Sequence, residues 1–257
     1  MNYIGIDIGS TCAKTVVLNE KKEFIQEFVQ PTGWSSVDTA EEILQKLKLA
    51  GINLSDDPSC CVATGYGRIS VPYADKAVTE ITCHALGAVH LFHQPDLTVI
   101  DIGGQDTKII QIEQGFVKDF IMNDKCAAGT GRFLEVMANT LSLRPNEMFE
   151  LARLGSDTTI SSMCTVFAES EVIGLIGKGE PKENIAYAVV DSTIRKVTAQ
   201  LSRMNGEMST FCLTGGLCEC EYIREALSKK LGKESDLQPD ARYAGAIGAA
   251  LSAMKIR

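Results

Sequence analysis

The sequence has few aromatic residues, few histidines and no excess of positive charge. Of its 257 residues 6% are aromatic, with one Trp, and three are His; 25 Lys and Arg stand against 33 Asp and Glu, giving a net charge of −8 at pH 7. Such an acidic chain lacks the broad basic surface that nucleic acids and anionic lipids attract. We therefore expect neither a nucleic acid nor a membrane among its partners.

Long apolar runs and the common nucleotide-binding motifs are also missing. No run reaches the roughly 18 apolar residues of a membrane span, and the first residues lack the basic region and cleavage site of a secretion signal. A cytoplasmic location is expected. The sequence contains neither G-x-x-x-x-G-K-[ST] nor a complete G-x-G-x-x-G, so it predicts neither a P-loop nor a Rossmann site.

What the sequence does contain is 45% hydrophobic residues and nine cysteines. This hydrophobic content and length suffice for one long domain or two short ones. In a reducing compartment disulfides are rare, and thiols more often serve metal binding, catalysis or core packing. Some of the cysteines therefore need a role other than a disulfide.

An internal repeat organises the chain. Residues 7–14 read D-I-G-S-T-C-A-K and residues 101–108 read D-I-G-G-Q-D-T-K. Each copy ends an apolar strand pattern, Tyr3–Ile8 or Leu97–Ile102, and two further strand patterns follow it. The sequence thus predicts two three-stranded meanders, completed by Thr15–Leu18 and Phe24–Val29 in the first copy and by Ile109–Ile112 and Phe116–Met122 in the second.

Each meander is followed by a strand, a Thr-Gly turn and a helix. The first turn, T-G-Y-G, begins 57 residues after Asp7, whereas the second, T-G-G-L, begins 113 residues after Asp101. The second half therefore carries an elaboration that includes Cys126 and Cys164 or borders on them. The other predicted elements are helices over about Ser36–Ala50, Ala77–Leu91 and Glu221–Lys230, strands over Cys60–Ala63 and Thr210–Leu213, and a closely packing small-residue helix within A-R-Y-A-G-A-I-G-A-A-L.

The bends of the two D-I-G hairpins suit phosphate binding. Glycine lets main-chain N–H groups approach phosphate oxygens, Ser10 and Thr11 add hydroxyl donors, and an Asp can hold a hydrated Mg²⁺. Together with the T-G-G turn, the paired hairpins resemble those of the actin, sugar-kinase and heat-shock ATPase superfamily.

This resemblance implies an α/β fold, a duplicated ribonuclease-H-like pair of domains with mixed five-stranded sheets and a nucleotide cleft between them. The domains would comprise residues 1–95 plus 239–257 and residues 96–238. ATP and Mg²⁺ would be bound there. The implied catalytic residues are Asp7, Asp101 and Gln105, and the implied nucleotide-binding residues are Ser10, Thr11, Cys12, Ala13, Lys14, Gly103, Gly104, Gln105, Thr214, Gly215 and Gly216.

Cys126 and Cys164 each precede an apolar helical pattern, so we expect both just before a helix N-terminus. The partial positive charge of a helix N-terminus favours a thiolate or an anionic metal–sulfur cluster. By position alone, however, a lone Cys is more often a small core residue. Position therefore leaves both readings open.

The segments around these cysteines, N-D-K-C-A-A-G-T-G-R-F and S-S-M-C-T-V-F-A-E-S-E-V, resemble the activator component of 2-hydroxyacyl-CoA dehydratases, a family related to the ATP-binding subunits of benzoyl-CoA reductase. A-T-G-Y-G-R and C-H-A-L-G-A support the resemblance. It implies a homodimer that functions under anaerobic conditions. One [4Fe–4S] cluster would be held by Cys126 and Cys164 of both subunits. ATP hydrolysis would then drive an electron from ferredoxin or flavodoxin to a dehydratase.

Two other functions remain open at this point. A small-molecule kinase could use the same fold, and a structural ATPase could bind zinc with the same four thiolates. Packing or loop roles are expected for six other cysteines, Cys60, Cys61, Cys83, Cys212, Cys218 and Cys220.

Overall fold

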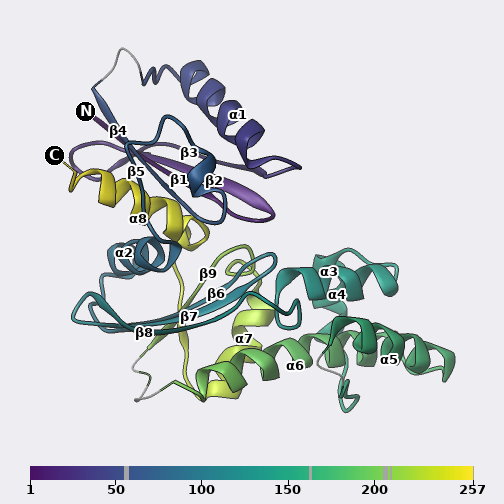
Figure 1. The fold of residues 1–257 in the computed structure, drawn as a ribbon. Coiled ribbons are helices and arrows are strands. Elements are labelled where there is room, and N and C mark those ends of the chain that lie inside the picture. The colour runs from purple at the N-terminus through teal and green to yellow at the C-terminus, as the bar shows by residue number, and fades with distance from the viewer. Residues whose placement is uncertain (55–57, 162–163, 205–207, 209, 257) are drawn as a thin grey trace. The chain divides into compact units, whose positions relative to one another are not determined.

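The computed structural model describes residues 1–54, 58–161, 164–204, 208 and 210–256. The chain forms two compact units. One comprises Met1–Val99, Ile110–Lys118 and Gln238–Arg257, and the other comprises Ile100–Ile109 and Asp119–Leu237. The frame of the fold is two five-stranded sheets with helices (Figure 1). The expected domain boundaries stay a prediction.

The first sheet has the strand order β3-β2-β1-β4-β5. β1 pairs antiparallel with β2 and parallel with β4, so the predicted meander is confirmed and the sheet is mixed. The register sets Asp7 opposite both Lys14 and Thr64. The strands are β1 (Asn2–Ile8), β2 (Cys12–Leu18), β3 (Phe24–Pro31), β4 (Ser59–Thr64) and β5 (Lys76–Ala77).

Alternation along β1 sends its side chains to two different layers. Ile4, Ile6 and Ile8 are buried in one core with α1 (Ser36–Leu49). The alternate residues face α8 (Ala244–Ala253). Tyr3 packs against the buried cluster of α8, and a Cβ on Gly5 would overlap the carbonyl oxygen of Ala246. Asp7 therefore points to the α8 side of the sheet.

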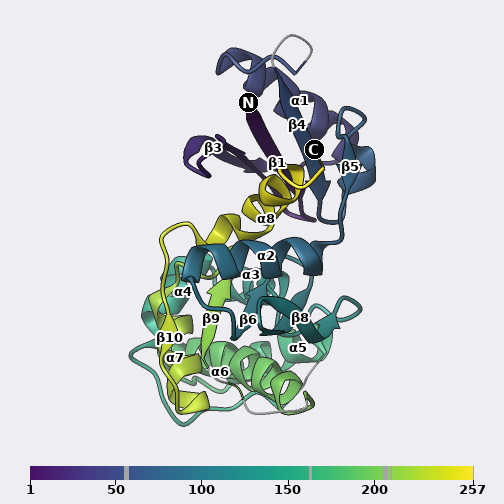
Figure 2. The same ribbon diagram turned by 90° about the vertical axis from the view of Figure 1, so that its left-hand side faces the viewer.

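The small-residue helix α8 packs as closely as its composition predicts. It lies beside α2 (Glu80–Phe92) in both views (Figures 1 and 2). A Cβ on Gly87 of α2 would overlap the carbonyl oxygen of Ala244, and one on Gly248 would overlap that of Cys83. Glycine is needed where the two backbones approach each other this closely.

The prediction that the second helix begins near Ala77 is wrong. Lys76–Ala77 form the edge strand β5, which pairs with β4, and the Val78 amide donates to the Ala63 carbonyl at 2.9 Å. The helix starts at Glu80 because Thr79, with φ −65° and ψ 145°, is still extended. A two-residue edge strand has too few residues to show a periodic pattern.

The second sheet has the order β10-β9-β6-β7-β8 and repeats the hairpin arrangement of the first. β9 and β10 pair in parallel. The strands lie close to their predicted ranges, except that β10 was not predicted. They are β6 (Leu97–Ile102), β7 (Thr107–Glu113), β8 (Phe116–Asn123), β9 (Phe211–Thr214) and β10 (Ser235–Asp236).

Helices make up most of the elaboration in the second half (Figure 1, teal to green). The patterns after Cys126 and Cys164 correspond to α3 (Gly131–Thr140) and α5 (Thr165–Gly177). α4 (Pro145–Ala152) and the 20-residue α6 (Lys182–Leu201) were not predicted, and α7 (Glu221–Leu231) was. None of the described helices is long and apolar enough to span a membrane.

Candidate nucleotide hairpins and cysteine segments

The first D-I-G hairpin joins β1 to β2, with Ser10 and Thr11 at its tip. The Gly9 amide donates to the Cys12 carbonyl at 3.1 Å, and the Thr32 hydroxyl donates to the Gly9 carbonyl at 2.7 Å. The chain after β3 therefore fixes the loop. Ala13 is buried in the core, so only its main chain is available to a ligand. Lys14 is 8% exposed and Cys12 half-buried.

The buried carboxylate of Asp7 has one oxygen that no described residue satisfies. Its side chain is 3% exposed, and Oδ1 has no hydrogen-bond partner among the described residues. Gly65, at φ +85°, leaves space beside it, because a Cβ there would stand 2.5 Å from Oδ1. A buried carboxylate oxygen without a donor is costly. A hydrated cation is the kind of partner that would satisfy it.

The second D-I-G hairpin holds its aspartate differently. Asp101 is also 3% exposed, but Lys108 Nζ lies 3.1 Å from its Oδ2 and the Thr214 hydroxyl donates to its Oδ1 at 2.9 Å. Lys108 also pairs with Asp106 Oδ2 at 2.9 Å. One buried ammonium thus ties together both carboxylates of the hairpin.

The T-G-G turn meets this hairpin at the end of β9. Gly215, at φ +79°, passes so close to Asp101 that a Cβ would stand 2.5 Å from its Oδ1. A side chain on Gly216 would meet nothing within 4 Å. Gln105 is exposed at the hairpin tip beyond Gly103 and Gly104. The structure therefore brings the predicted residues of the second half together, as it does those of the first.

The second hairpin is also fastened to α3, which the sequence did not indicate. The Gly131 amide donates to the Gly103 carbonyl at 2.9 Å, and the Arg132 amide donates to the Gly104 carbonyl at 2.8 Å. The Thr107 hydroxyl donates to the Gly129 carbonyl at 2.6 Å. The loop that contains Cys126 is thus bonded at its far end to the hairpin.

The two cysteines implied as metal ligands occupy different local settings. Cys164 is exposed and is the N-cap residue of α5, as expected. Cys126 is half-buried and lies five residues before α3, whose N-cap is Thr130, so the expectation that it stands just before a helix N-terminus is wrong. Asn123 fixes its loop by donating to the Cys126 carbonyl at 2.8 Å. Residues 162 and 163 of the second motif lie outside the described residues.

The remaining cysteines suit packing roles. Five of the six are buried and Cys220 is half-buried. Burial raises the pKa of Cys83 to about 12, and it also raises the pKa values of Cys61, Cys212 and Cys220. A raised pKa keeps these groups as neutral thiols, which are poor metal ligands.

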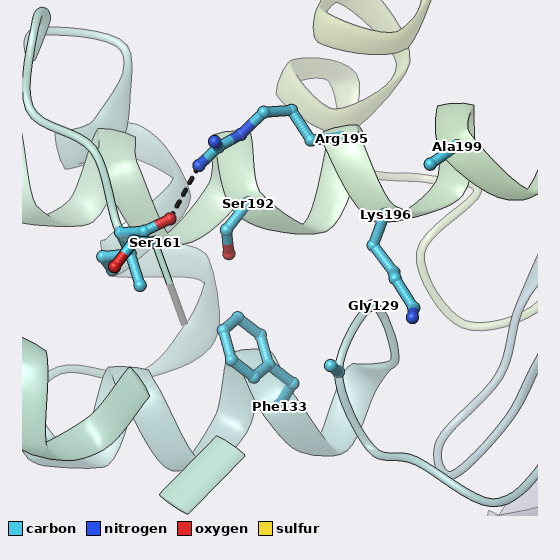
Figure 3. Close-up of a pocket in the computed structure, with 9 residues that line it drawn as sticks. Gly129, Phe133, Ser161, Ser192, Arg195, Lys196 and Ala199 are labelled. Carbon is cyan, nitrogen blue, oxygen red and sulfur yellow. Dashed lines mark hydrogen bonds between the residues drawn. The ribbon is translucent and has the colours of Figure 1, made fainter. Parts of the chain in front are cut away.

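A cavity of about 240 Å³ connects the two cysteine segments (Figure 3). Ala128 and Gly129, just after Cys126, line it, and so do Ile160 and Ser161, shortly before Cys164. Within the part of the chain that the structure describes, no cysteine belongs to a close group of three or more metal-binding side chains. The two segments are therefore neighbours, and their described residues do not by themselves form a complete metal site.

Residues 4–253 match the BadF/BadG/BcrA/BcrD ATPase family. The chain belongs to this family. It is 43% identical over 255 residues to the (R)-2-hydroxyglutaryl-CoA dehydratase activating ATPase of Acidaminococcus fermentans, covering 98% of this chain and 96% of that protein. The predicted resemblance to the dehydratase activators is thereby confirmed.

Solved structures agree with this family assignment. Component A of the Acidaminococcus fermentans enzyme matches with a TM-score of 0.91 at 41% identity, covering 100% of this chain and 98% of that one. The 2-hydroxyisocaproyl-CoA dehydratase activator from Clostridium difficile, with bound ADPNP, matches with a TM-score of 0.90 at 33% identity, covering 100% and 95%. A glucokinase from Streptomyces griseus, 16% identical with a TM-score of 0.60 over 99% of this chain and all of that one, shows the fold alone. The predicted fold class is confirmed.

Proposed function

We propose that this family member is an ATP-hydrolysing iron–sulfur activator that delivers a low-potential electron to a 2-hydroxyacyl-CoA dehydratase-type partner. Similarity over nearly the whole chain to proteins named as dehydratase activators supports the class of function. The observation that carries the mechanism is the set of hydrogen bonds between the second hairpin and the loop of Cys126.

Both hairpins take part in binding MgATP in this proposal. Main-chain N–H groups at their tips donate to phosphate oxygens, as glycine-containing bends do elsewhere. Asp7 would hold the hydrated Mg²⁺, because its buried Oδ1 has no partner among the described residues, and the cation would neutralise charge on the phosphates. The exposed Gln105 positions the attacking water, and Thr214–Gly216 lie beside the adenosine.

The chemistry of Cys126 and Cys164 fits an iron–sulfur cluster shared by two subunits. Neither thiol is fully buried, and the N-terminus of α5 at Cys164 favours an anion. Four thiolates are the usual complement of a [4Fe–4S] cluster, so two per chain require a second copy. When bound, the cluster would supply one-electron redox chemistry.

The exposed apolar side chains of α5 favour a homodimer contact next to Cys164. Val166 and Phe167 are 67% and 66% exposed, and Ile173 and Ile176 are 57% and 46% exposed. Such a group on one helix is unfavourable in water unless it is covered. A second copy would cover it and bring the second pair of cysteines.

Nucleotide binding is coupled to the cysteines through the protein backbone. A movement of the second hairpin shifts Gly131 and Arg132 by their hydrogen bonds, and with them the start of α3 and the preceding loop. Such a shift changes the hydrogen bonding and solvent exposure of Cys126, two factors that set the potential of an iron–sulfur centre. A reduced ferredoxin or flavodoxin would be the electron donor.

Anaerobic purification tests the proposal. We expect a brown dimer that bleaches in air, contains about four iron and four sulfide per dimer and hydrolyses MgATP. A colourless protein with stoichiometric zinc would indicate the structural ATPase instead. A metal-free monomer that forms ADP only with an added small-molecule substrate would indicate a kinase. In either case the proposal would be rejected.

A further inference from the structure

The cavity between the cysteine segments has walls of two chemical kinds (Figure 3). Most of its lining is apolar, contributed by Phe133 and Ile160 together with Ala128 and Ala199. The other part of the wall is polar and comes mainly from α6. Its polar lining residues are Ser161, Ser192, Arg195 and Lys196.

The two cations of the cavity differ in their partners. Arg195 already has partners within the protein. Its Nε lies 2.9 Å from Asp191 Oδ2, and its guanidinium donates to the Ile160 carbonyl at 2.9 Å. Lys196 extends toward Gly129 and forms no ion pair with any residue that the structure describes (Figure 3). Its stem packs on the backbone, because a Cβ on Gly129 would stand 2.7 Å from Lys196 Cγ. One positive charge of the cavity is thus left uncompensated.

The hydroxyl groups add acceptors rather than negative charge. The Ser192 hydroxyl donates to the Val189 carbonyl at 2.8 Å and keeps its acceptor capacity toward the cavity. The Ser161 hydroxyl is bonded to Glu171. None of the described lining residues is acidic, so the cavity offers a cation no charged ligand among them.

We infer that this cavity binds a small organic monocarboxylate with an apolar body. The carboxylate pairs with Lys196, and the apolar body lies against Phe133 and Ile160. One uncompensated charge matches a monoanion, whereas a phosphate dianion in mainly apolar walls would lack donors. At about 240 Å³ the cavity is smaller than the roughly 300–1,000 Å³ typical of drug-sized ligands, so the acid is small.

Such a ligand lies between the two cysteine segments. It would contact both the segment after Cys126 and the segment before Cys164, and so hold the two together. Its binding does not depend on the proposed electron transfer, because none of the nine lining residues is a cysteine or belongs to a hairpin. The two proposals therefore fail separately.

Calorimetric titration of the full-length protein with benzoate, and in parallel with benzyl alcohol as a neutral probe of similar shape, tests the inference. We expect saturable binding of benzoate that Lys196→Met weakens by about tenfold or more, while the affinity for benzyl alcohol changes little. Lys182→Met removes an exposed lysine from the start of the same helix and is the matched control. Ala199→Phe enlarges a side chain of the cavity wall and should weaken both probes.

Several outcomes would overturn the inference. They are the absence of saturable benzoate binding to the natural chain, equal benzoate affinity in Lys196→Met and Lys182→Met, and displacement of benzoate by an equal concentration of inorganic phosphate. Circular dichroism of each variant identifies misfolding. If Lys196→Met does not fold, unchanged benzoate affinity in Ala199→Phe would overturn the inference instead.

Discussion

The two D-I-G hairpins share a motif and a position in their sheets but differ in how they hold their aspartate. Asp101 has a protein partner on each oxygen, Thr214 on Oδ1 and Lys108 on Oδ2. Asp7, equally buried, has no partner on Oδ1 within the described chain. The same motif therefore contains one carboxylate that the protein satisfies and one that it leaves available.

This difference indicates that the two D-I-G hairpins have different roles. A satisfied buried ion pair fixes the conformation of its loop, and removing one partner leaves an unpaired buried charge. An unsatisfied buried oxygen destabilises the fold until a ligand supplies its partner. We therefore expect Asp101 to act mainly in stability and hairpin position, and Asp7 mainly in MgATP chemistry.

The largest effect should fall on a feature that the first half lacks. Cys126→Ser or Cys164→Ser should abolish the iron–sulfur centre completely, because in a two-fold dimer each substitution removes two of four ligands. Dimerisation should weaken too, since binding of the cluster is linked to association. Iron and acid-labile sulfide per dimer, with sedimentation under anaerobic conditions, measure both.

Cys220→Ser is the matched control for this loss. Like Cys164, Cys220 is the N-cap residue of a helix, α7, and serine caps helices well. Its iron content should equal that of the natural protein. Full iron content in Cys126→Ser would remove that residue from the metal site.

The next largest effect tests the satisfied hairpin. Lys108→Met should lower the free energy of unfolding by about 3–5 kcal/mol, because it leaves Asp101 and Asp106 close together without their cation. Urea denaturation measures the loss. Lys118→Met removes the exposed pair with Glu113 and should cost about 0–1 kcal/mol. Equal costs for the two variants would mean that the buried pair does not hold the hairpin.

The available carboxylate should show the opposite behaviour. Asp7→Asn should lower the rate of MgATP hydrolysis by about 100-fold or more while costing less stability than Asp101→Asn, since no described residue donates to its buried Oδ1. Steady-state ADP formation and urea denaturation of both variants give the comparison. Unchanged turnover and nucleotide affinity in Asp101→Ala would in turn exclude the second hairpin from the nucleotide site.

Sequence patterns were sufficient for the repeated parts of the fold but not for the interactions between them. The strands of both meanders follow from apolar runs that end in D-I-G, and the T-G-G turn follows from its composition. The pairing of Asp101 with Thr214, 113 residues away, and the bonds from Gly103 and Gly104 to α3 depend on tertiary contacts that no local pattern encodes.

The elaboration was the least predictable region. Cys126 was expected just before a helix N-terminus because an apolar pattern follows it. Instead Ala127–Thr130 form a turn before α3, in which the Thr130 hydroxyl donates to the Ala127 carbonyl at 2.6 Å. The cavity beside it could not be predicted either, since its walls come from segments up to about 70 residues apart. The difference between Asp7 and Asp101 is invisible in the sequence for the same reason.

The smallest effect on stability concerns the second glycine of T-G-G. Gly215 is required by its φ of +79° and by the closeness of Asp101, but a side chain on Gly216 would meet nothing within 4 Å. The matching position of the first turn, T-G-Y-G, is Tyr66, which is 79% exposed. The local fold therefore tolerates a large side chain here, and a glycine in the second turn needs another reason.

Close approach of the nucleotide is the reason we expect. Gly216→Ala should change the free energy of unfolding by no more than about 0.5 kcal/mol, as surface substitutions usually do, yet weaken ATP binding. Gly216→Tyr, which copies the first turn, should weaken it further, whereas Tyr66→Gly should leave it unchanged. Gly215→Ala should instead cost about 1–3 kcal/mol of stability through its strained backbone. Titration with a non-hydrolysable ATP analogue measures affinity, and if Gly216→Tyr binds the analogue as the natural chain does, the T-G-G turn does not lie at the nucleotide.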